Sequence, residues 1–324
     1  MKNNRVVILF NKISENPLQD ELDVLAQVNL VSKALSKLGY ITTHIPFSFE
    51  INKAIDQIKK IDPYFVFNLV ESIDNKGELC HLAPAVLRSM EIPYSGVPVE
   101  GMFLTTNKIL TKSILRSNNL PTADWFMLNE SGQLKKKSRY ILKPTLEDGS
   151  LGLDIENVFY GSDKKLIDSF KNLDNDKFFI EEFIDGREFN ISVIGGNQGP
   201  EVLSPAEMLF IDFPENLPKI LGYKAKWNEE SEEYKKTVRT FDFKEKNKTL
   251  IDTLTSISQQ CWKIFGLKGY ARIDFRLDQN ENPFILEINA NPCIAPDSGL
   301  VAAIHHKGYP FEEVIARIVE DIFI

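Results

Sequence analysis

The sequence has few cysteines and no long apolar run. Its three cysteines, Cys80, Cys261 and Cys293, are widely spaced and form no CxxC pair. This excludes a zinc ribbon and a disulfide framework and is typical of a reducing compartment. No stretch approaches the ~20 apolar residues of a membrane span, and the apolar run 6–10 is too short for a signal peptide. We therefore expect a cytoplasmic protein without a membrane partner.

Basic residues are also in deficit. Lys and Arg number 38 against 46 Asp and Glu, which gives a net charge of −8 and a pI near 5.3. This argues against nucleic acid as the main partner, because phosphate backbones need a basic surface. The 43% hydrophobic and 26% charged fractions over 324 residues are those of a globular protein with two or three domains.

Several familiar motifs are missing. There is no GxxxxGK[ST], no GxGxxG and no GxSxG, and the four histidines show no metal-ligand spacing. A Walker-type nucleotide loop, a dinucleotide-binding fold and a serine nucleophile are thereby excluded.

The segment Arg272–Asn289 is the most informative part of the chain. Two apolar runs, ARIDF and PFILEIN, flank the polar stretch 278–282, and this pattern predicts a β-hairpin. Residues two apart on a strand share a face, so Glu287 and Asn289 point the same way, and the register can bring Asp274 beside them. Such oxygen donors suit Mg²⁺ held against phosphate. The alternative is that these acids are solvated, but the apolar neighbours of Glu287 indicate a buried strand.

Strands and helices alternate in the first part of the chain, which predicts a small parallel sheet with ligands near the carboxyl ends of its strands. Strands are expected at 5–10, 41–45 and 64–69, and helices at about 18–38, 51–60 and 79–90. Further on we expect a helix from 106 to 116 with Thr106 as N-cap, strands near 125–128, 139–143, 178–182 and 188–194, and a helix from about 243 to 265.

Lys143 ends one of these strands and precedes the loop Glu147–Gly152, which is rich in small residues. Backbone N–H groups of such a loop can approach phosphate while the lysine neutralises its charge. The apolar connector 178–184 can offer a purine a flat slot, and Glu188 can accept hydrogen bonds from ribose hydroxyls. Taken alone, the first segment is better explained as a surface turn, and an edge strand with solvated acids explains the second about as well as a purine site does.

Together the segments resemble the ATP-grasp superfamily. TTNKILTK with Lys108, Lys143 with its glycine loop, EEFIDGREF, GYKAKW, ARIDF and LEINANP occur in that order and at similar spacings. The chain is most similar to the D-alanine–D-alanine ligases, over almost its whole length. The resemblance implies an α/β ATP-grasp fold with three parts: an amino-terminal parallel-sheet domain (1–104), a small central subdomain with the ATP lid (105–184) and a carboxy-terminal mixed-sheet subdomain (185–324).

The resemblance also implies a role for individual residues. The residues expected to hold ATP are Lys108, Lys143, Glu181, Glu182, Phe183, Ile184, Glu188, Lys226 and Leu286. The ligands expected for two Mg²⁺ ions, with Mn²⁺ as an alternative, are Asp274, Glu287 and Asn289. The residues expected to take part in catalysis are Arg272, Lys226 and Ser150, and those expected to contact substrate are Glu71, Arg272, Cys293, Ser298 and Gly299.

Departures from the ligase pattern concentrate on the substrate side. Glu71 stands where the ligases carry a histidine, Trp227 where they carry a tyrosine, and Gly149 where they carry that tyrosine's serine partner. Cys293 replaces a glycine, and Asn11–Glu21 replaces the GGxSxE segment that holds the first D-alanine. Nucleotide and metal residues are thus kept while amino-acid-binding residues differ, which puts D-alanine in doubt as the substrate.

These features favour an ATP-dependent carboxylate–amine ligase for small amino-acid-like substrates, working through an acyl phosphate. Cys293 is not expected to act as a nucleophile, since a thiol needs an activating base. Three alternatives stay open: an authentic D-alanine–D-alanine ligase, an ATP-grasp kinase, and an ATP-binding pseudo-enzyme or sensor. Ligases of this type are commonly dimeric, so a homodimer is left open too.

Overall fold

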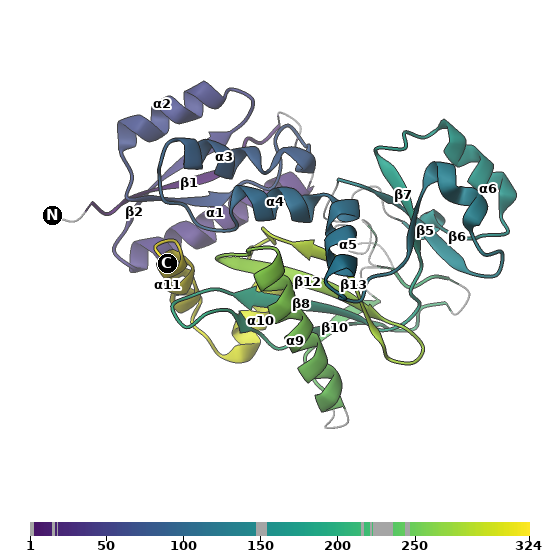
Figure 1. Ribbon diagram of the computed structural model, residues 1–324. Helices are drawn as coiled ribbons and strands as arrows, with labels where there is room; N and C mark the ends of the chain where they lie inside the picture. Colours follow the sequence, from purple (N-terminus) through teal and green to yellow (C-terminus); the bar gives the residue numbers. More distant parts are fainter. Residues whose placement is uncertain are drawn as a thin grey trace.

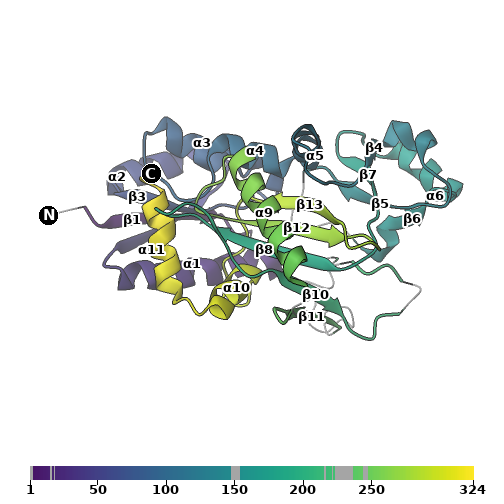
Figure 2. The same cartoon turned by 60° about the horizontal axis from the view of Figure 1, so that its bottom comes forward.

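The computed structural model describes residues 3–14, 17, 19–146, 154–214, 217–220, 222, 236–243 and 247–324. Its described parts form three β-sheets that follow one another along the chain (Figure 1). In Figure 2 the sheets lie in a row, with the carboxy-terminal sheet between the other two. The expected α/β architecture is confirmed.

The first sheet is parallel, with the order β2-β1-β3. Its elements are β1 (Arg5–Asn11), α1 (Gln19–Lys37), β2 (Ile41–Phe47), α2 (Ile51–Ile61) and β3 (Phe65–Leu69), followed by the 3₁₀ turn η1 (Gly77–Leu79) and α3 (Leu82–Ser89). Helix α1 stops before Gly39, whose φ of 88° is a left-handed conformation that glycine adopts without strain. The predicted alternation of strand and helix is confirmed here.

The segment that joins the first two sheets differs from the prediction. Thr106 is not an N-cap, because it ends a helix that the sequence did not reveal, α4 (Val99–Thr106). The cap of α5 (Lys108–Ser117) is Asn107, whose side chain accepts hydrogen bonds from two backbone N–H groups, those of Ile109 and Leu110. The domain boundary expected after residue 104 therefore falls inside α4.

The central sheet is antiparallel, with the order β4-β7-β5-β6. Its elements are β4 (Trp125–Met127), η2 (Leu128–Gln133), β5 (Arg139–Pro144), η3 (Ile155–Asn157), β6 (Val158–Tyr160), α6 (Lys164–Ser169), η4 (Phe170–Asn172) and β7 (Phe178–Glu182). Tyr140, Phe159 and Phe170 pack beneath it as a small aromatic core.

The carboxy-terminal sheet has the order β11-β10-β8-β12-β13, with β9 paired to β8. Its elements are β8 (Glu188–Ile194), β9 (Glu201–Val202), β10 (Ala206–Phe210), β11 (Thr237–Thr240), α9 (Lys248–Ile264), β12 (Tyr270–Leu277) and β13 (Pro283–Asn289). A mixed sheet was expected here, but each described strand pair is antiparallel. The parallel component is a single bridge between Thr122 and Ile285. Helix α9, expected from about residue 243, begins at Lys248.

The last two helices, α10 (Gly299–Lys307) and α11 (Phe311–Asp321), return to the amino-terminal sheet. Ile304 and Ile315 are buried with Val28 of α1 and Phe67 of β3 in one apolar core, and Figure 1 places α11 beside the first sheet. The two ends of the chain thus stabilise one another. Within the described residues, no helix has the length and apolar character needed to cross a bilayer.

Candidate active site

The hairpin of β12 and β13 sets the geometry of the site. Asp274 lies directly opposite Glu287 in the strand register, and Arg272 lies opposite Asn289. The turn between the strands is held by Asp278, whose Oδ1 accepts hydrogen bonds from the backbone N–H groups of Asn280 and Asn282. The hairpin and the convergence of its polar residues, as read from the sequence, are therefore found in the structure.

A β-bulge interrupts the register at this point. Asp274 pairs with Glu287, but the next residue, Phe275, pairs with Ile285, so Leu286 is the extra residue on β13. A bulge re-aims the side chains beside it and is common next to functional sites. Leu286, expected to contact the nucleotide, directly precedes Glu287 at this bulge.

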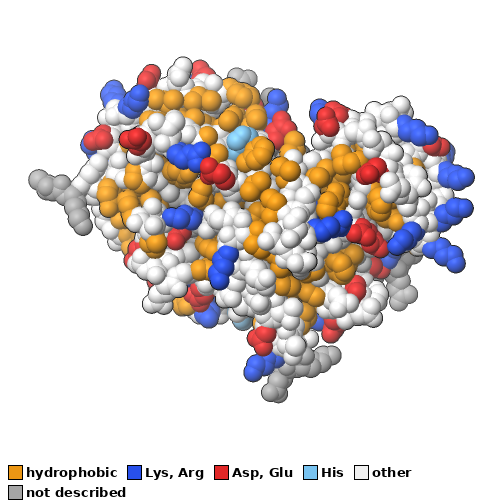
Figure 3. Space-filling model, in the orientation of Figure 1, with side chains coloured by type: hydrophobic (Ala, Val, Ile, Leu, Met, Phe, Trp, Pro, Cys, Tyr) orange, Lys and Arg blue, Asp and Glu red, His pale blue; other side chains and the backbone are white. Residues whose placement is uncertain are grey.

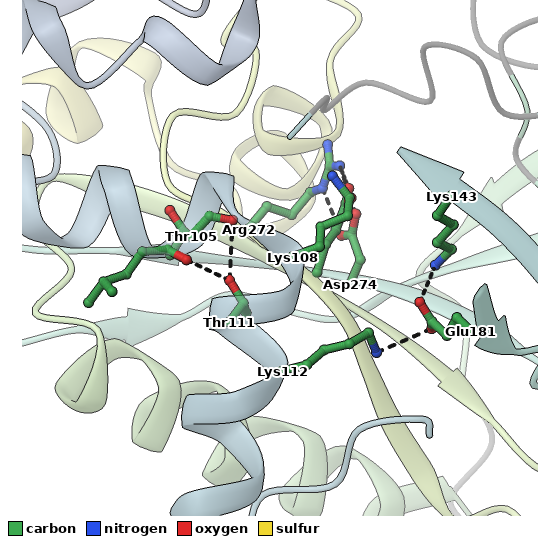
Figure 4. A network of polar contacts seen from close by, with 10 residues as sticks. Thr105, Lys108, Thr111, Lys112, Lys143, Glu181, Arg272 and Asp274 are labelled. Carbon is green, nitrogen blue, oxygen red and sulfur yellow. Dashed lines mark hydrogen bonds and ion pairs between the residues drawn. The ribbon is translucent and has the colours of Figure 1, made fainter. Parts of the chain in front are cut away.

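Two cations accompany these carboxylates. The Arg272 guanidinium donates to both oxygens of Asp274, at 2.8 and 2.7 Å, and its Nη2 lies 3.7 Å from Glu287 Oε1. Lys108 Nζ, at the start of α5, lies 3.8 Å from Glu287 Oε2. Burial alone would lower the pKa of Arg272, but Asp274 and Glu287 outweigh it and raise that pKa above its ordinary value. Arg272 is therefore a permanent cation at the centre of the site (Figure 4).

A second charged group adjoins the first. Glu181, near the end of β7, lies between two lysines: Lys143 Nζ is 3.0 Å from Oε2 and Lys112 Nζ is 3.3 Å from Oε1. Figure 4 shows Lys143 and Lys112 pointing at this carboxylate from opposite sides. Burial raises the pKa of Glu181, but the two lysines prevail and hold it below its usual value.

The connector between β7 and β8 is organised by one buried arginine. Arg276 donates to Glu188 Oε2 from Nε at 3.1 Å and from Nη2 at 2.8 Å, and it donates to the carbonyls of Ile184 and Lys219. The Phe183 ring lies 5.2 Å from the guanidinium carbon of Arg276. Both Arg276 hydrogen bonds to the carboxylate use Oε2 rather than Oε1, and the ribose contact expected for Glu188 stays a prediction.

The ring of Phe183 also faces Arg139 of β5, whose guanidinium carbon is 5.2 Å from the ring centre. One aromatic ring therefore contacts guanidinium groups from the central and carboxy-terminal sheets. Glu182, next to it, is half-buried, and its backbone N–H donates to Asp124 O at 2.8 Å. These contacts fix the connector on which a purine was expected to lie.

The substrate-side residues Glu71 and Cys293 belong to a separate polar network. Gln27 of α1 donates to Glu71 Oε1 at 2.8 Å and accepts from the backbone N–H of Ile294 at 3.1 Å. The Cys293 thiol donates to Asp23 Oδ2 at 2.9 Å. Burial, with Glu71 and Asp23 adding to it, raises the pKa of Cys293 well above its ordinary value. The thiol therefore stays protonated near neutral pH, as expected for a residue that is not a nucleophile.

Ser298 and Gly299 form the amino-terminal end of α10. Ser298 is its N-cap, and its hydroxyl accepts from the backbone N–H of Val301 at 3.3 Å. A helix start favours a carboxylate, and the role expected for this pair stays a prediction.

The donor set of the hairpin suits Mg²⁺ that is also bound by a triphosphate. Among the described residues, no three His, Cys, Asp or Glu side chains lie close enough together to hold a metal alone. Asp274 and Glu287 supply two carboxylates and Asn289 one carboxamide, so an ion here would take its remaining ligands from phosphate and water, as Mg²⁺ usually does. The hydroxyl of Thr145 is buried without a hydrogen-bond partner among the described residues. It follows Lys143 by two residues, so a phosphate oxygen is a partner that fits its position.

Other expected residues cannot be placed. Lys226, Trp227, Ser150 and the rest of the loop Glu147–Gly152 lie outside the described residues.

Residues 114–320 match the family model described as "D-ala D-ala ligase C-terminus". The chain belongs to the D-alanine–D-alanine ligase family. It is accordingly an ATP-dependent ligase of the ATP-grasp superfamily, as the motif order predicted.

Individual relatives extend the likeness to the whole chain. It is 30% identical to the protein y4sG of Sinorhizobium fredii over 79% of this chain and 73% of the relative. It is 26% identical to a D-alanine–D-alanine ligase of Aquifex aeolicus over 97% of this chain and 99% of the relative. A D-alanine–D-alanine ligase structure from Bacillus anthracis, complexed with ATP, superposes with a TM-score of 0.71 over 98% of this chain and 97% of that one, at 19% identity. This last likeness concerns the fold.

The sequence motifs did not identify three residues of the site. Lys112 follows Lys108 by four positions and so lies on the same face of α5, a spacing that could have identified it. Asn190 donates to Asp274 Oδ1 at 2.9 Å, and Arg276 holds Glu188. Both depend on the pairing of β8 with β12, which no local pattern reveals.

Proposed function

We propose that the protein is an ATP-dependent carboxylate–amine ligase that joins small amino-acid-like substrates and releases ADP and phosphate. The observation that carries the proposal is the strand register that sets Asp274 against Glu287, with Arg272 and Lys108 in contact with them. The carboxylates match the charge of the metal ion, and the neighbouring cations match the charge of the phosphate oxygens of a metal-bound triphosphate.

The chemistry explains why ATP is needed. A carboxylate does not react with an amine near neutral pH, because oxide would have to leave. A substrate carboxylate oxygen attacks the γ-phosphorus, the bond from that phosphorus to the bridging oxygen breaks, and ADP leaves. The amine then attacks the acyl carbon, phosphate departs, and the amine loses a proton. Mg²⁺ held by Asp274, Glu287 and Asn289 would neutralise phosphate charge.

The chain's own residues would supply the remaining charge. Lys108 and Lys143 would pair with phosphate oxygens, because both ammonium groups lie at ends of elements that converge on the site. Arg272 would stabilise the oxyanion that forms when the amine attacks, since it remains cationic throughout. The Ser298–Gly299 helix start would hold a substrate carboxylate. The proposed domains stay 1–104, 105–184 and 185–324, with the first boundary inside α4.

D-alanine remains a candidate substrate, because relatives that match 90% or more of this chain are named D-alanine–D-alanine ligases. Against it, Glu71 and Cys293 belong to a network with Asp23 and Gln27 on the side where amino acids would bind.

The test is phosphate release from ATP with a panel of D- and L-amino acids, alone and in pairs, with mass spectrometry of the products. An amide product formed with stoichiometric phosphate supports the ligase. Fast turnover with D-alanine alone identifies it as the substrate. A stable phosphorylated product formed without any amine would instead indicate a kinase. ATP binding without turnover under every condition would indicate a sensor.

A further inference from the structure

The carboxylate of Glu181 has two cationic partners, and the proposed function uses only one of them. Lys143 is expected to reach the triphosphate, whereas Lys112 extends from the body of α5 and has no such role. The side chains of Lys112 and Glu181 are each 1% exposed, against 11% for Lys143. The pair Lys112–Glu181 is therefore buried, and Lys143 lies at its edge.

The two lysines hold Glu181 differently. Lys112 also donates a hydrogen bond to the Thr122 hydroxyl at 2.8 Å, and that hydroxyl donates to the carbonyl of Ile285 at 3.2 Å. Ile285 lies on β13, two residues before Glu287. Lys112 is thus tied to the strand that carries a proposed metal ligand.

Lys143 is the more exposed of the two partners. Its Nζ lies 3.0 Å from Glu181 Oε2, but its side chain is 11% exposed, against 1% for Lys112. An ion pair of this kind at the edge of a buried group can separate if the carboxylate keeps another partner. Without Lys112, the departure of Lys143 would leave a buried carboxylate without any counter-charge, which is strongly unfavourable.

We propose that Lys112 is a positioning residue for ATP: it neutralises buried Glu181, so that Lys143 is free to leave that carboxylate and pair with the triphosphate. The inference rests on the proposed function, because it assumes that Lys143 binds phosphate. It makes Glu181 a resting partner of Lys143 in the absence of nucleotide.

The state of Lys112 agrees with this role. Burial lowers the pKa of Lys112 to about 8, with Lys143 and Arg116 adding to the decrease and Glu181 opposing it. Lys112 is therefore charged at neutral pH and loses its proton as the pH rises through about 8. Such a group neutralises one buried carboxylate, but its charged form is only slightly more stable than its neutral form at neutral pH.

The first experiment measures ATP affinity by calorimetric titration with Mg²⁺ present and no amino acid. Lys112→Met should weaken ATP binding by about tenfold or more, because Glu181 then retains Lys143. The KM for ATP should rise by a similar factor, while kcat at saturating ATP changes much less. The matched control is Lys263→Met on the exposed face of α9, which should bind ATP as the wild type does.

The second experiment separates positioning from a merely structural role. In Lys112→Met/Glu181→Gln the carboxylate that retains Lys143 is gone, so ATP affinity should recover to within about threefold of the Glu181→Gln single variant. Thermal unfolding of each variant verifies that it is folded. Additive losses in the double variant, or wild-type affinity in folded Lys112→Met, would overturn the inference. Lack of ATP binding by the wild type would instead overturn the proposed function itself.

Discussion

Replacement of Arg276 by methionine should destabilise the protein more than any exposed charge substitution. Arg276 is 3% exposed and has three hydrogen-bonded partners: the Glu188 carboxylate and the carbonyls of Ile184 and Lys219. Its removal leaves Glu188, 6% exposed, as a buried carboxylate without its cation. Breaking a buried ion pair by removing one partner costs about 3–5 kcal/mol.

The assay is urea unfolding followed by fluorescence, with ATP affinity measured on the folded protein. Arg276→Met should lower the free energy of unfolding by about 3–5 kcal/mol, and Arg276→Met/Glu188→Gln should recover a large part of that loss because no charge is then buried alone. The control is Arg88→Met, in an exposed pair with Glu100, which should remain close to wild type. A loss for Arg276→Met no larger than that of Arg88→Met would refute the assignment of a buried, compensating ion pair.

Two further substitutions and one pH profile test other parts of the site. Cys293→Ser should keep kcat within about threefold of wild type, and loss of all turnover would point to a nucleophile. The native thiol should react slowly with iodoacetamide at neutral pH, because its raised pKa keeps it protonated. Thr145→Val should raise the free energy of unfolding by about 1 kcal/mol without nucleotide, because it removes a buried hydroxyl that has no partner among the described residues. The same change should weaken ATP binding, and an unchanged affinity would exclude a phosphate contact. Wild-type ATP affinity should fall as pH rises through about 8, where Lys112 loses its proton beside Glu181, and Lys112→Met should lack this decrease; identical pH profiles would contradict the role of Lys112.

The parts of the fold that local pattern determines were predictable. The parallel sheet follows from apolar strands that alternate with amphipathic helices, and α2 shows this in the spacing of buried Ala54 and Ile58. The hairpin was predictable because its alternation has a period of two and a polar turn separates its strands. The sequence alone therefore predicts that Asp274 and Glu287 lie together.

The failures have physical causes. Thr106 and Asn107 are both good N-cap residues, and the sequence does not reveal that the Thr106 hydroxyl is used by its own helix, where it donates to Met102 O at 2.8 Å. Helix α4 was not predicted, because its last residue, Thr106, is also a good N-cap for the next helix. The central role of Arg276 depends on the register of β8 with β12, whose strands are separated by more than 70 residues.

The substrate side was the least predictable. Glu71 and Cys293 stood out as departures from the ligase pattern, but their partners Gln27 and Asp23 lie on α1, far away in sequence. A homodimer likewise stays a prediction.

The most direct test of the account is the effect of Glu287→Gln on metal-dependent turnover. This change keeps the shape of the side chain and removes the charge that faces Asp274, Arg272 and Lys108. With the exposed substitution Glu100→Gln as control, we expect the rate of ATP-dependent phosphate release to fall by about a thousandfold, with an unchanged circular dichroism spectrum and a higher Mg²⁺ requirement. Turnover near the wild-type rate at the same Mg²⁺ concentration would contradict the central claim that this carboxylate holds metal against phosphate.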